Sequence, residues 1–377
     1  MVTMDTADIE TDLSLFKYDT LEQLPPEYRT LSESERRPRI EAALSELGDD
    51  VVVLGHNYQR REIVEHADFV GDSYELSKRA AEADAEYVIF GGVTFMAESA
   101  DIITDDDQTV ILPSMEASCP MAGMAEALQV DAAWAEITAA APDAEIIPIT
   151  YMNSYADLKA FCASQGGLVC TSSNAHRAFE WAFERGDKVL FLPDKHLGEN
   201  TAHRLGMEDE VATWDPWDPA GKDPDEVVES DIICWDGYCQ VHERFTTEHV
   251  EQVREDNPEA SVVVHPECRR EVVEAADVVG STSTICETIE TADPGETWAI
   301  GTEIHLTEHL QRWHPDVEVL PLCGDACMDC NAMRQIDPNY LTWVLEELVA
   351  GRERNVIEVA ADEKELAGVA LERMLEV

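Results

Sequence analysis

The stretch VVVLGHNY, residues 51–58, decides the fold, because an apolar run rich in β-branched residues stops abruptly at hydrogen-bonding side chains. Such a run is typical of a strand buried inside a parallel sheet. Two later stretches have the same form, EIIPITYMN at 145–153 and SVVVHPEC at 261–268. Ligands bind at the carboxyl ends of strands in open parallel sheets, so we expect a site at these three ends. Their side chains are His56, Asn57 and Tyr58 in the first, Tyr151 and Asn153 in the second, and His265, Glu267 and Cys268 in the third.

Each stretch begins a longer unit with a common order of features. A second short strand leads to a Gly or Ser/Thr turn, and Ser73, Ser172 and Thr282 stand at or near the start of an expected helix. One such hydroxyl alone is more often a plain helix cap, but three in equivalent places favour a shared anion site. After a third strand, each unit reaches a cysteine. These cysteines are Cys119, Cys239 and Cys330.

This repeat predicts an α/β fold of three homologous α/β/α, Rossmann-like domains. Their short parallel sheets are expected to surround a pseudo-threefold axis, with the active site at the centre and the three cysteines pointing to it. The second unit also contains an acidic, Trp/Pro-rich insertion at about 206–230, expected to be a surface loop. The C-terminal helix is expected to lie on the third or first unit. The expected segments are an acidic arm at 1–40, units at 41–142, 143–256 and 257–345, and a C-terminal helical segment at 346–377.

The charge is extreme, with 79 acidic residues against 26 Lys and Arg and a formal net charge of -53. This excess disfavours nucleic acids and anionic membranes as partners, and it indicates a halophilic protein whose surface is adapted to high salt. The sequence has no apolar run of membrane-spanning length, and its first residues lack the features of a signal peptide. We therefore expect a cytoplasmic protein, whose ten cysteines are thiols or metal ligands rather than disulfides.

The segment CGDACMDC, residues 323–330, leaves two interpretations of the cysteines open. Cys323, Cys327 and Cys330 match the spacing of a local cluster, as in radical S-adenosylmethionine enzymes. Alternatively, Cys330 joins Cys119 and Cys239, while Cys323 and Cys327 form a reversible thiol pair, load a cluster or have no role. Thiolates select zinc or iron–sulfur clusters. A cubane cluster held by three cysteines leaves one iron open to act as a Lewis acid, which suits dehydration and condensation.

Several motifs together resemble the quinolinate synthase (quinolinate synthetase A) family, and they cover roughly residues 50–335. They are GHNYQ, GDSYELS, YMNS, CTSSNA, GYCQVHERF, HPEC, GSTS and the terminal CNAM. The resemblance implies three α/β/α domains around a central cavity and a [4Fe–4S] cluster with one open iron. Its three ligands would be Cys119, Cys239 and Cys330. It also implies a transferase-type condensation of iminoaspartate with dihydroxyacetone phosphate, which gives quinolinate, phosphate and two waters for NAD biosynthesis.

The resemblance also assigns roles to the strand-end residues. His56 and Tyr58 would contact substrate and assist proton transfer. Glu267 would be the general acid and base of the dehydrations, with His265 beside it, and such groups typically contribute 10²–10⁴-fold. His242, in contrast, receives no role. The residues expected to bind substrate are His56, Ser73, Tyr151, Asn153, Ser172, His265, Glu267 and Thr282.

Two other functions stay open on the sequence alone. One is a different [4Fe–4S] hydro-lyase that acts on a small dicarboxylate. The other is a redox sensor that uses CGDACMDC, although no DNA-binding motif supports it. An aspartate oxidase or dehydrogenase, as the source of iminoaspartate, is the partner expected from the pathway. The family can carry CxxCxxC where this chain has CxxxCxxC, which affects the roles of Cys323 and Cys327 but not that of Cys330.

Overall fold

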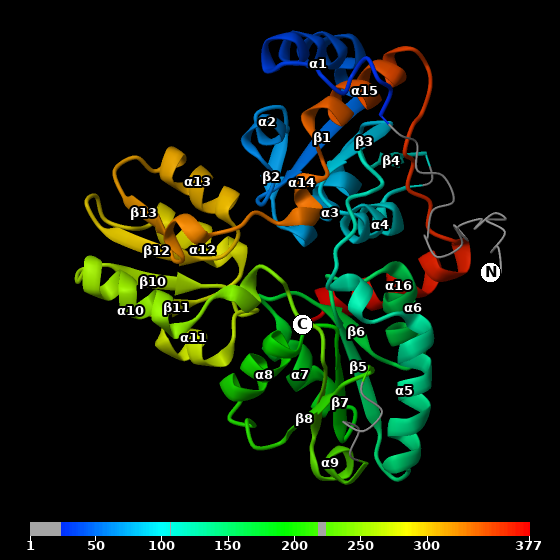
Figure 1. Cartoon of the computed structure of the whole chain (residues 1–377). Coiled ribbons are helices and arrows are strands. Elements are labelled where there is room, and N and C mark those ends of the chain that lie inside the picture. Colours follow the sequence, from blue (N-terminus) through cyan, green and yellow to red (C-terminus); the bar gives the residue numbers. More distant parts are fainter. Residues whose placement is uncertain (1–23, 106, 218–223) are drawn as a thin grey trace, which may run out of the picture.

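A computed structural model describes residues 24–105, 107–217 and 224–377. Three separate sheets follow one another along the chain, and every strand pair in them is parallel (Figure 1). Helices cover the sheets and connect their strands. The α/β class and the short parallel sheets predicted from the sequence are therefore confirmed.

The three sheets share one strand order. In each, the first strand of the unit lies between the second and the third, and the last strand of the unit pairs with the third. The second unit has one additional strand, which pairs with its last strand at the edge of the sheet. Residues of the first strands β1 and β5 are buried along their whole length, as expected for apolar runs inside a sheet. The strands are β1 (Val51–His56), β2 (Phe69–Gly71), β3 (Tyr87–Gly91) and β4 (Thr109–Ile111) in the first unit, β5 (Ile146–Tyr151), β6 (Leu168–Cys170), β7 (Lys188–Leu192), β8 (Val211–Trp214) and β9 (Ile232–Trp235) in the second, and β10 (Ser261–Val264), β11 (Val278–Val279), β12 (Thr297–Gly301) and β13 (Glu318–Pro321) in the third.

Most helices lie between consecutive strands, as crossover connections of parallel sheets require. Those of the first unit are α2 (Arg61–Val64), α3 (Ser73–Glu82) and α4 (Thr94–Ile103). Those of the second are α5 (Ala127–Ala140), which precedes its sheet, α6 (Ala156–Ser164), α7 (Ala175–Phe183), α8 (Lys195–Arg204) and α9 (Pro224–Glu229). Those of the third are α10 (Thr247–Asp256), α11 (Arg270–Ala275), α12 (Thr282–Glu290) and α13 (Ile304–Trp313), and the chain closes with α14 (Asn331–Arg334), α15 (Pro338–Val349) and α16 (Ala361–Leu375).

The expected acidic arm contains the start of a helix. Helix α1 (Glu33–Leu47) begins inside residues 1–40, because Ser32 and Glu35 form a capping box. Arg39 on this helix donates a hydrogen bond from Nε to Glu346 of α15 at 2.7 Å. This part of the arm therefore packs against α15, and residues 1–23 lie outside the described residues.

The acidic insertion of the second unit is not simply a surface loop. Residues 211–214 form β8, an extra edge strand that pairs with β9, and residues 224–229 form α9. Trp214 and Val227 are buried in the core of this unit, which explains why the segment folds back on the sheet. The expectation of a loop was wrong for these residues, and residues 218–223 lie outside the described part of the chain.

The C-terminal helix packs mainly on the second unit, not on the third or first as expected. Helix α16 lies along α6 and β6 and also touches α4 of the first unit (Figure 1). Its buried face contains Ala367, Ala370, Leu371 and Met374, and Arg373 donates to the carbonyl oxygen of Gly167 at 2.6 Å. This helix therefore joins the first two units.

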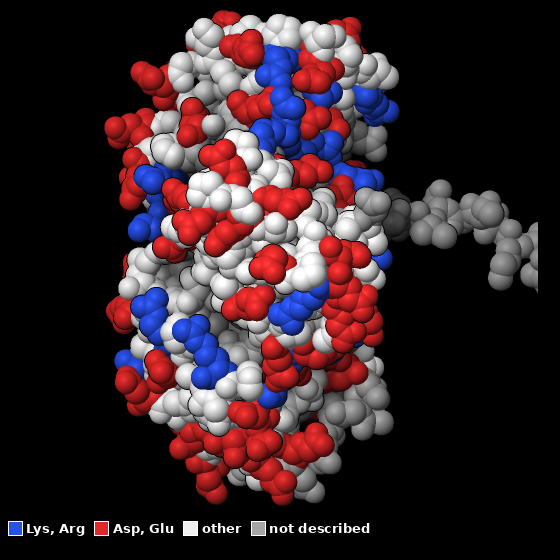
Figure 2. Space-filling view, turned by 90° about the vertical axis from the view of Figure 1, so that its left-hand side faces the viewer, with Lys and Arg blue, Asp and Glu red and all other residues white. Residues whose placement is uncertain are grey.

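Acidic side chains are spread over the whole visible face of the molecule, with Lys and Arg interspersed among them (Figure 2). Several basic groups of the surface form exposed ion pairs, such as Arg254 with Asp277 and Arg270 with Glu274. Exposed pairs contribute little to stability, so the surface mainly provides charge and hydration. Among the described helices, none combines the length and the apolar character needed to cross a membrane.

Candidate active site

Every residue with a predicted catalytic, substrate-binding or metal-binding role lines one cavity, whereas Asn57 and Cys268, also at the strand ends, do not line it. Side chains from all three units meet there, so residues separated by more than 200 positions become neighbours. This convergence follows from the shared topology, because each unit turns the carboxyl end of its first strand toward the same space. The functional roles of these residues stay predictions. The predicted residues that line the cavity are His56, Tyr58, Ser73, Cys119, Tyr151, Asn153, Ser172, Cys239, His265, Glu267, Thr282 and Cys330.

The end of β1 places a neutral histidine in the cavity. His56 is the last residue of β1, and burial lowers its pKa to about 4. Its Nδ1 accepts a hydrogen bond from the backbone N–H of Tyr58 at 3.0 Å. Because a neutral imidazole has one donor and one acceptor nitrogen, the proton is on Nε2. His56 is thus able to donate a hydrogen bond at neutral pH without carrying charge.

Glu267 is the buried anion of the site. Its carboxylate accepts from His242 Nδ1 at 2.7 Å and also from the hydroxyl of Tyr151, which in turn accepts from Ser172. Burial alone would raise the pKa of Glu267, but the rings of His265 and His242 and these hydrogen bonds lower it below its usual value. A carboxylate held in this way is ionised at neutral pH and available as a base.

His265 lies beside this carboxylate in a neutral form. Burial lowers the pKa of His265 to about 3, although Glu267 opposes the shift. Its ring stacks on that of His242 with centroids 4.6 Å apart. The stacking fixes the two imidazoles together next to Glu267.

His242 is a site residue that sequence reasoning missed. It is almost fully buried, lines the cavity and contacts Glu267, while its Nε2 lies 2.9 Å from Oγ1 of Thr302. Thr302 is in turn 2.7 Å from the hydroxyl of Tyr58. The signal was present in GYCQVHERF, where His242 follows Cys239 by one helical turn, but nothing in the sequence alone distinguished it from other histidines.

A continuous row of hydrogen bonds therefore links the first unit with the third. In the tautomer with its proton on Nδ1, His242 donates to the carboxylate of Glu267, and its Nε2 accepts from the Thr302 hydroxyl. The Tyr58 hydroxyl then donates to Thr302, whose only proton is already used. This row connects two residues to which the sequence assigns proton transfer, Tyr58 and Glu267.

The predicted hydroxyls lie at the cavity, although their local settings differ. Ser73 and Thr282 are the first residues of α3 and α12, as expected. Ser172 lies in the turn before α7, near the helix start as expected, and Asn174 is the N-cap residue of that helix. Ser283 and Asp72 connect the two helix starts through a hydrogen bond of 2.7 Å. Two of the three hydroxyls thus mark helix starts, and the third is held by Tyr151.

The three predicted cysteine ligands have a common local geometry. Each precedes a short turn whose backbone N–H groups point at its sulfur, from Met121 and Ala122, from His242, and from Ala332 and Met333. Burial nevertheless raises the pKa of Cys119 to about 12 and that of Cys330 to about 11, and it raises the pKa of Cys239 well above its ordinary value. Such thiols stay protonated unless a cation coordinates them.

Cys323 and Cys327 are joined by a disulfide, with Cα atoms 5.2 Å apart. The general expectation that the cysteines are thiols or metal ligands was wrong for this pair, but the disulfide fits the reversible thiol pair that the sequence left open. Their four-residue spacing in a turn brings the sulfurs together. Cys323 lines a different cavity, with Val241, Phe245 and His249. In this state the pair cannot ligate a local cluster with Cys330, so the structure does not support a local three-cysteine site.

Another group of three could also hold a metal ion. Ligand atoms of Cys239, His242 and Glu267 all lie within 4.8 Å of one another. Since His242 and Glu267 already bind each other, we interpret this group as part of the hydrogen-bonded row beside the cysteine. The only metal ligand that the sequence predicts in this group is Cys239.

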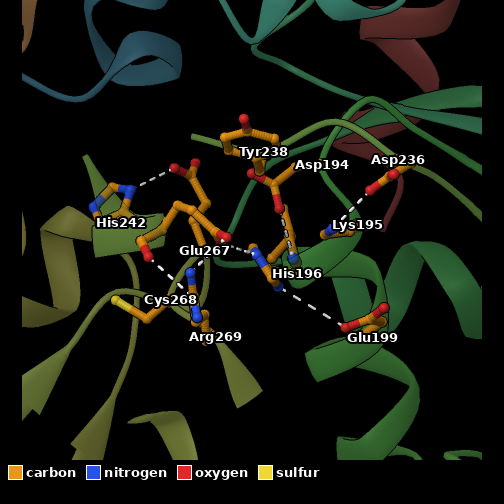
Figure 3. A network of polar contacts seen from close by, with 12 residues as sticks. Asp194, Lys195, His196, Glu199, Asp236, Tyr238, His242, Glu267, Cys268 and Arg269 are labelled. Carbon is orange, nitrogen blue, oxygen red and sulfur yellow. Dashed lines mark hydrogen bonds and ion pairs between the residues drawn. The ribbon is translucent and has the colours of Figure 1, made fainter. Parts of the chain in front are cut away.

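A second polar network supports the site from the side (Figure 3). His196 of α8 contacts Glu243, which also accepts from Arg269 Nη2 at 2.9 Å. Lys195 pairs with Asp236 at 2.6 Å. The network joins the second unit to the segment that carries Glu267, and so it fixes the interface on which the cavity depends.

The comparisons agree with the motifs read from the sequence. Residues 38–376 match the family described as quinolinate synthetase A protein. A quinolinate synthase of Haloarcula marismortui is 81% identical over 374 residues, which are 99% of this chain and 100% of the relative. Another from Halobacterium salinarum is 82% identical with the same coverage, and one from Acidobacterium capsulatum is 50% identical over 93% of this chain and 95% of its own. The chain belongs to the quinolinate synthetase A family, and two of these relatives come from halophilic genera, as the charge predicted.

Proposed function

We propose that this member of the family is a quinolinate synthase, which condenses iminoaspartate with dihydroxyacetone phosphate to quinolinate, phosphate and two waters in NAD biosynthesis. The observation that carries the proposal is the convergence of all predicted site residues in one cavity. Relatives up to 82% identical, with nearly complete coverage, carry the name quinolinate synthase. Both substrates are anionic, and the hydroxyls and neutral histidines of the cavity provide the donors that they need.

The residues of the cavity divide the proposed work between binding and proton transfer. Ser73, Ser172, Thr282 and Asn153 would hold the phosphate and carboxylate groups through hydrogen bonds. His56 would donate from Nε2 to a substrate oxygen. Glu267 would take protons from carbon and return them to the departing hydroxyl groups, with His265 beside it. Tyr58 would exchange protons with substrate, and the row through Thr302 and His242 would pass a proton on from Tyr58 to Glu267.

The three cysteines fit an iron–sulfur cluster as the cofactor. Thiols from three units reach one cavity, each with backbone N–H groups at its sulfur, and hydrogen bonds of this type stabilise cluster thiolates. We propose Cys119, Cys239 and Cys330 as the three ligands of a [4Fe–4S] cluster with one open iron. When bound, the open iron supplies Lewis acidity for loss of a hydroxyl group. The equivalent strand order of the three sheets also supports a pseudo-threefold arrangement around this position.

Other expectations about cellular context stay predictions. An enzyme that oxidises aspartate, such as an oxidase or dehydrogenase, must supply the unstable imine, so we expect it as a partner in the pathway. The cytoplasmic location and the absence of nucleic-acid and membrane partners are likewise predictions from the sequence.

The test is product formation by protein purified without oxygen in high salt. Iminoaspartate and dihydroxyacetone phosphate are supplied together, and quinolinate and phosphate are measured by chromatography. We expect the two products in equal amounts, and no quinolinate without either substrate. Conversion of a small hydroxy-dicarboxylate with no quinolinate would contradict the proposal and favour the alternative hydro-lyase.

A further inference from the structure

Each unit holds its cysteine loop from the same place, the residues directly after its third strand. In the third unit this residue is Glu303, which is completely buried and is the N-cap of α13. Its Oε1 accepts a hydrogen bond from the backbone N–H of Cys330 at 3.0 Å. A buried carboxylate outside the proposed chemistry thus contacts a proposed ligand residue directly.

The other two units contain related contacts. In the second, Asp194 is the N-cap of α8, is fully buried and forms a parallel β-bridge with Gly237, two residues before Cys239. In the first, the hydroxyl of Thr94 donates to the carbonyl oxygen of Ala117 at 3.1 Å, two residues before Cys119. Residues at the same place in all three units thus contact the segment before or at the cysteine, and in the third unit the contact reaches the proposed ligand Cys330 itself.

The donors around Glu303 identify its charge state. Oε1 faces Cys330 N–H and His305 Nδ1 at 2.9 Å, and Oε2 faces the backbone N–H of His305 at 2.7 Å. Each carboxylate oxygen accepts from a backbone N–H group, and His305 Nδ1–H is a third donor, in keeping with the pKa of His305, which Glu303 raises against the effect of burial. Glu303 is therefore best described as a carboxylate that is hydrogen-bonded directly to the backbone of Cys330, a proposed cluster ligand.

We propose that Glu303 is a positioning residue for the thiolate-bound cluster, which fixes the Cys330 loop and places a negative charge next to the cluster. This role rests on the proposed function, because it needs the cluster to be present. Removal of a group that hydrogen-bonds to a metal ligand typically lowers the affinity for the metal by about 10- to 100-fold. Nearby charge and hydrogen bonds also set the reduction potential of iron–sulfur clusters.

The experiment compares wild type with Glu303→Gln after reconstitution with iron and sulfide. Gln preserves size but replaces one acceptor oxygen with an NH₂ donor, which opposes an N–H group. We expect iron release to a chelator to be about 10- to 100-fold faster. We also expect a more positive reduction potential, since adding an electron becomes easier when a buried negative charge is gone. Glu308→Gln on the exposed side of α13 is the matched control and should behave as wild type.

Glu303→Asp keeps the charge but shortens the reach, so it should release iron faster while its potential stays near that of wild type. This variant also decides the question if Glu303→Gln does not fold. Unchanged iron release and potential in the folded variants would overturn the role of Glu303 alone. A wild-type chain that binds no iron and sulfide would instead overturn the proposed cluster, and this role with it.

Discussion

Removal of the His242 side chain tests the hydrogen-bonded row between Tyr58 and Glu267. The ring makes two contacts, 2.7 Å to the carboxylate and 2.9 Å to Thr302, and both are buried. A hydrogen bond to a charged group contributes about 1.5–3 kcal/mol, and each 1.4 kcal/mol is about tenfold in rate. If this energy orients Glu267 during reaction, His242→Ala should lower kcat by about 10- to 150-fold.

Two conservative variants separate the contacts of His242. In His242→Asn, the amide can occupy the place of Nδ1 and donate to Glu267. In His242→Gln, the amide can instead reach the place of Nε2 next to Thr302. We expect Asn to retain more activity than Gln, because orientation of the carboxylate is the larger effect.

The assay is steady-state quinolinate formation, with kcat expressed per bound cluster because His242 is three residues from Cys239. His314→Asn, at the end of α13 and outside the cavity, is the control. A kcat of His242→Ala within twofold of wild type at equal iron content would refute the reasoning. Equal losses in Asn and Gln would show that the contact with Glu267 is not the important one.

Three further predictions concern other parts of the structure. Glu267→Gln should lower kcat by about 10²–10⁴-fold with little change in iron content, and a loss below tenfold would exclude Glu267 as the main base. His56 has a folded pKa of about 4 against an ordinary value of 6.5, so the unfolded chain binds its proton first as the pH falls. Burial of neutral His56 therefore costs no stability above pH 6.5. As the pH falls from 6.5 to 4, the free energy of unfolding decreases by on the order of 3 kcal/mol. Denaturant titrations should show a smaller loss over this window in His56→Gln, and parallel curves would contradict the assigned pKa. Trp214→Ala should cost about 3–5 kcal/mol of stability in the same titrations, and a cost below 1 kcal/mol would mean that β8 is not part of the core.

The parts of this fold that could be predicted are those that depend on local patterns. The apolar runs at 51–58, 145–153 and 261–268 predicted buried parallel strands, because strands of this type need β-branched residues on both faces. The side chains that follow them then meet by topology alone, which is why Tyr58, Tyr151 and Glu267 could be selected together.

The missed features depend on distant partners. His242 gains its importance from Glu267 and Thr302, which lie 25 and 60 positions away. Part of the insertion forms β8 because the side chain of Trp214 is buried in the core of the second unit, although the acidic composition of the insertion indicated a loop. In both cases a tertiary contact outweighed the local pattern.

The most direct test of the central claim is the iron and sulfide content of anaerobic protein in high salt, for alanine variants of five cysteines. The account predicts that Cys119→Ala, Cys239→Ala and Cys330→Ala lose the cluster, whereas Cys323→Ala and Cys327→Ala retain it. Loss of the cluster in Cys323→Ala, Cys327→Ala and Cys330→Ala, with retention in the other two, would contradict the account and indicate a local cluster in CGDACMDC.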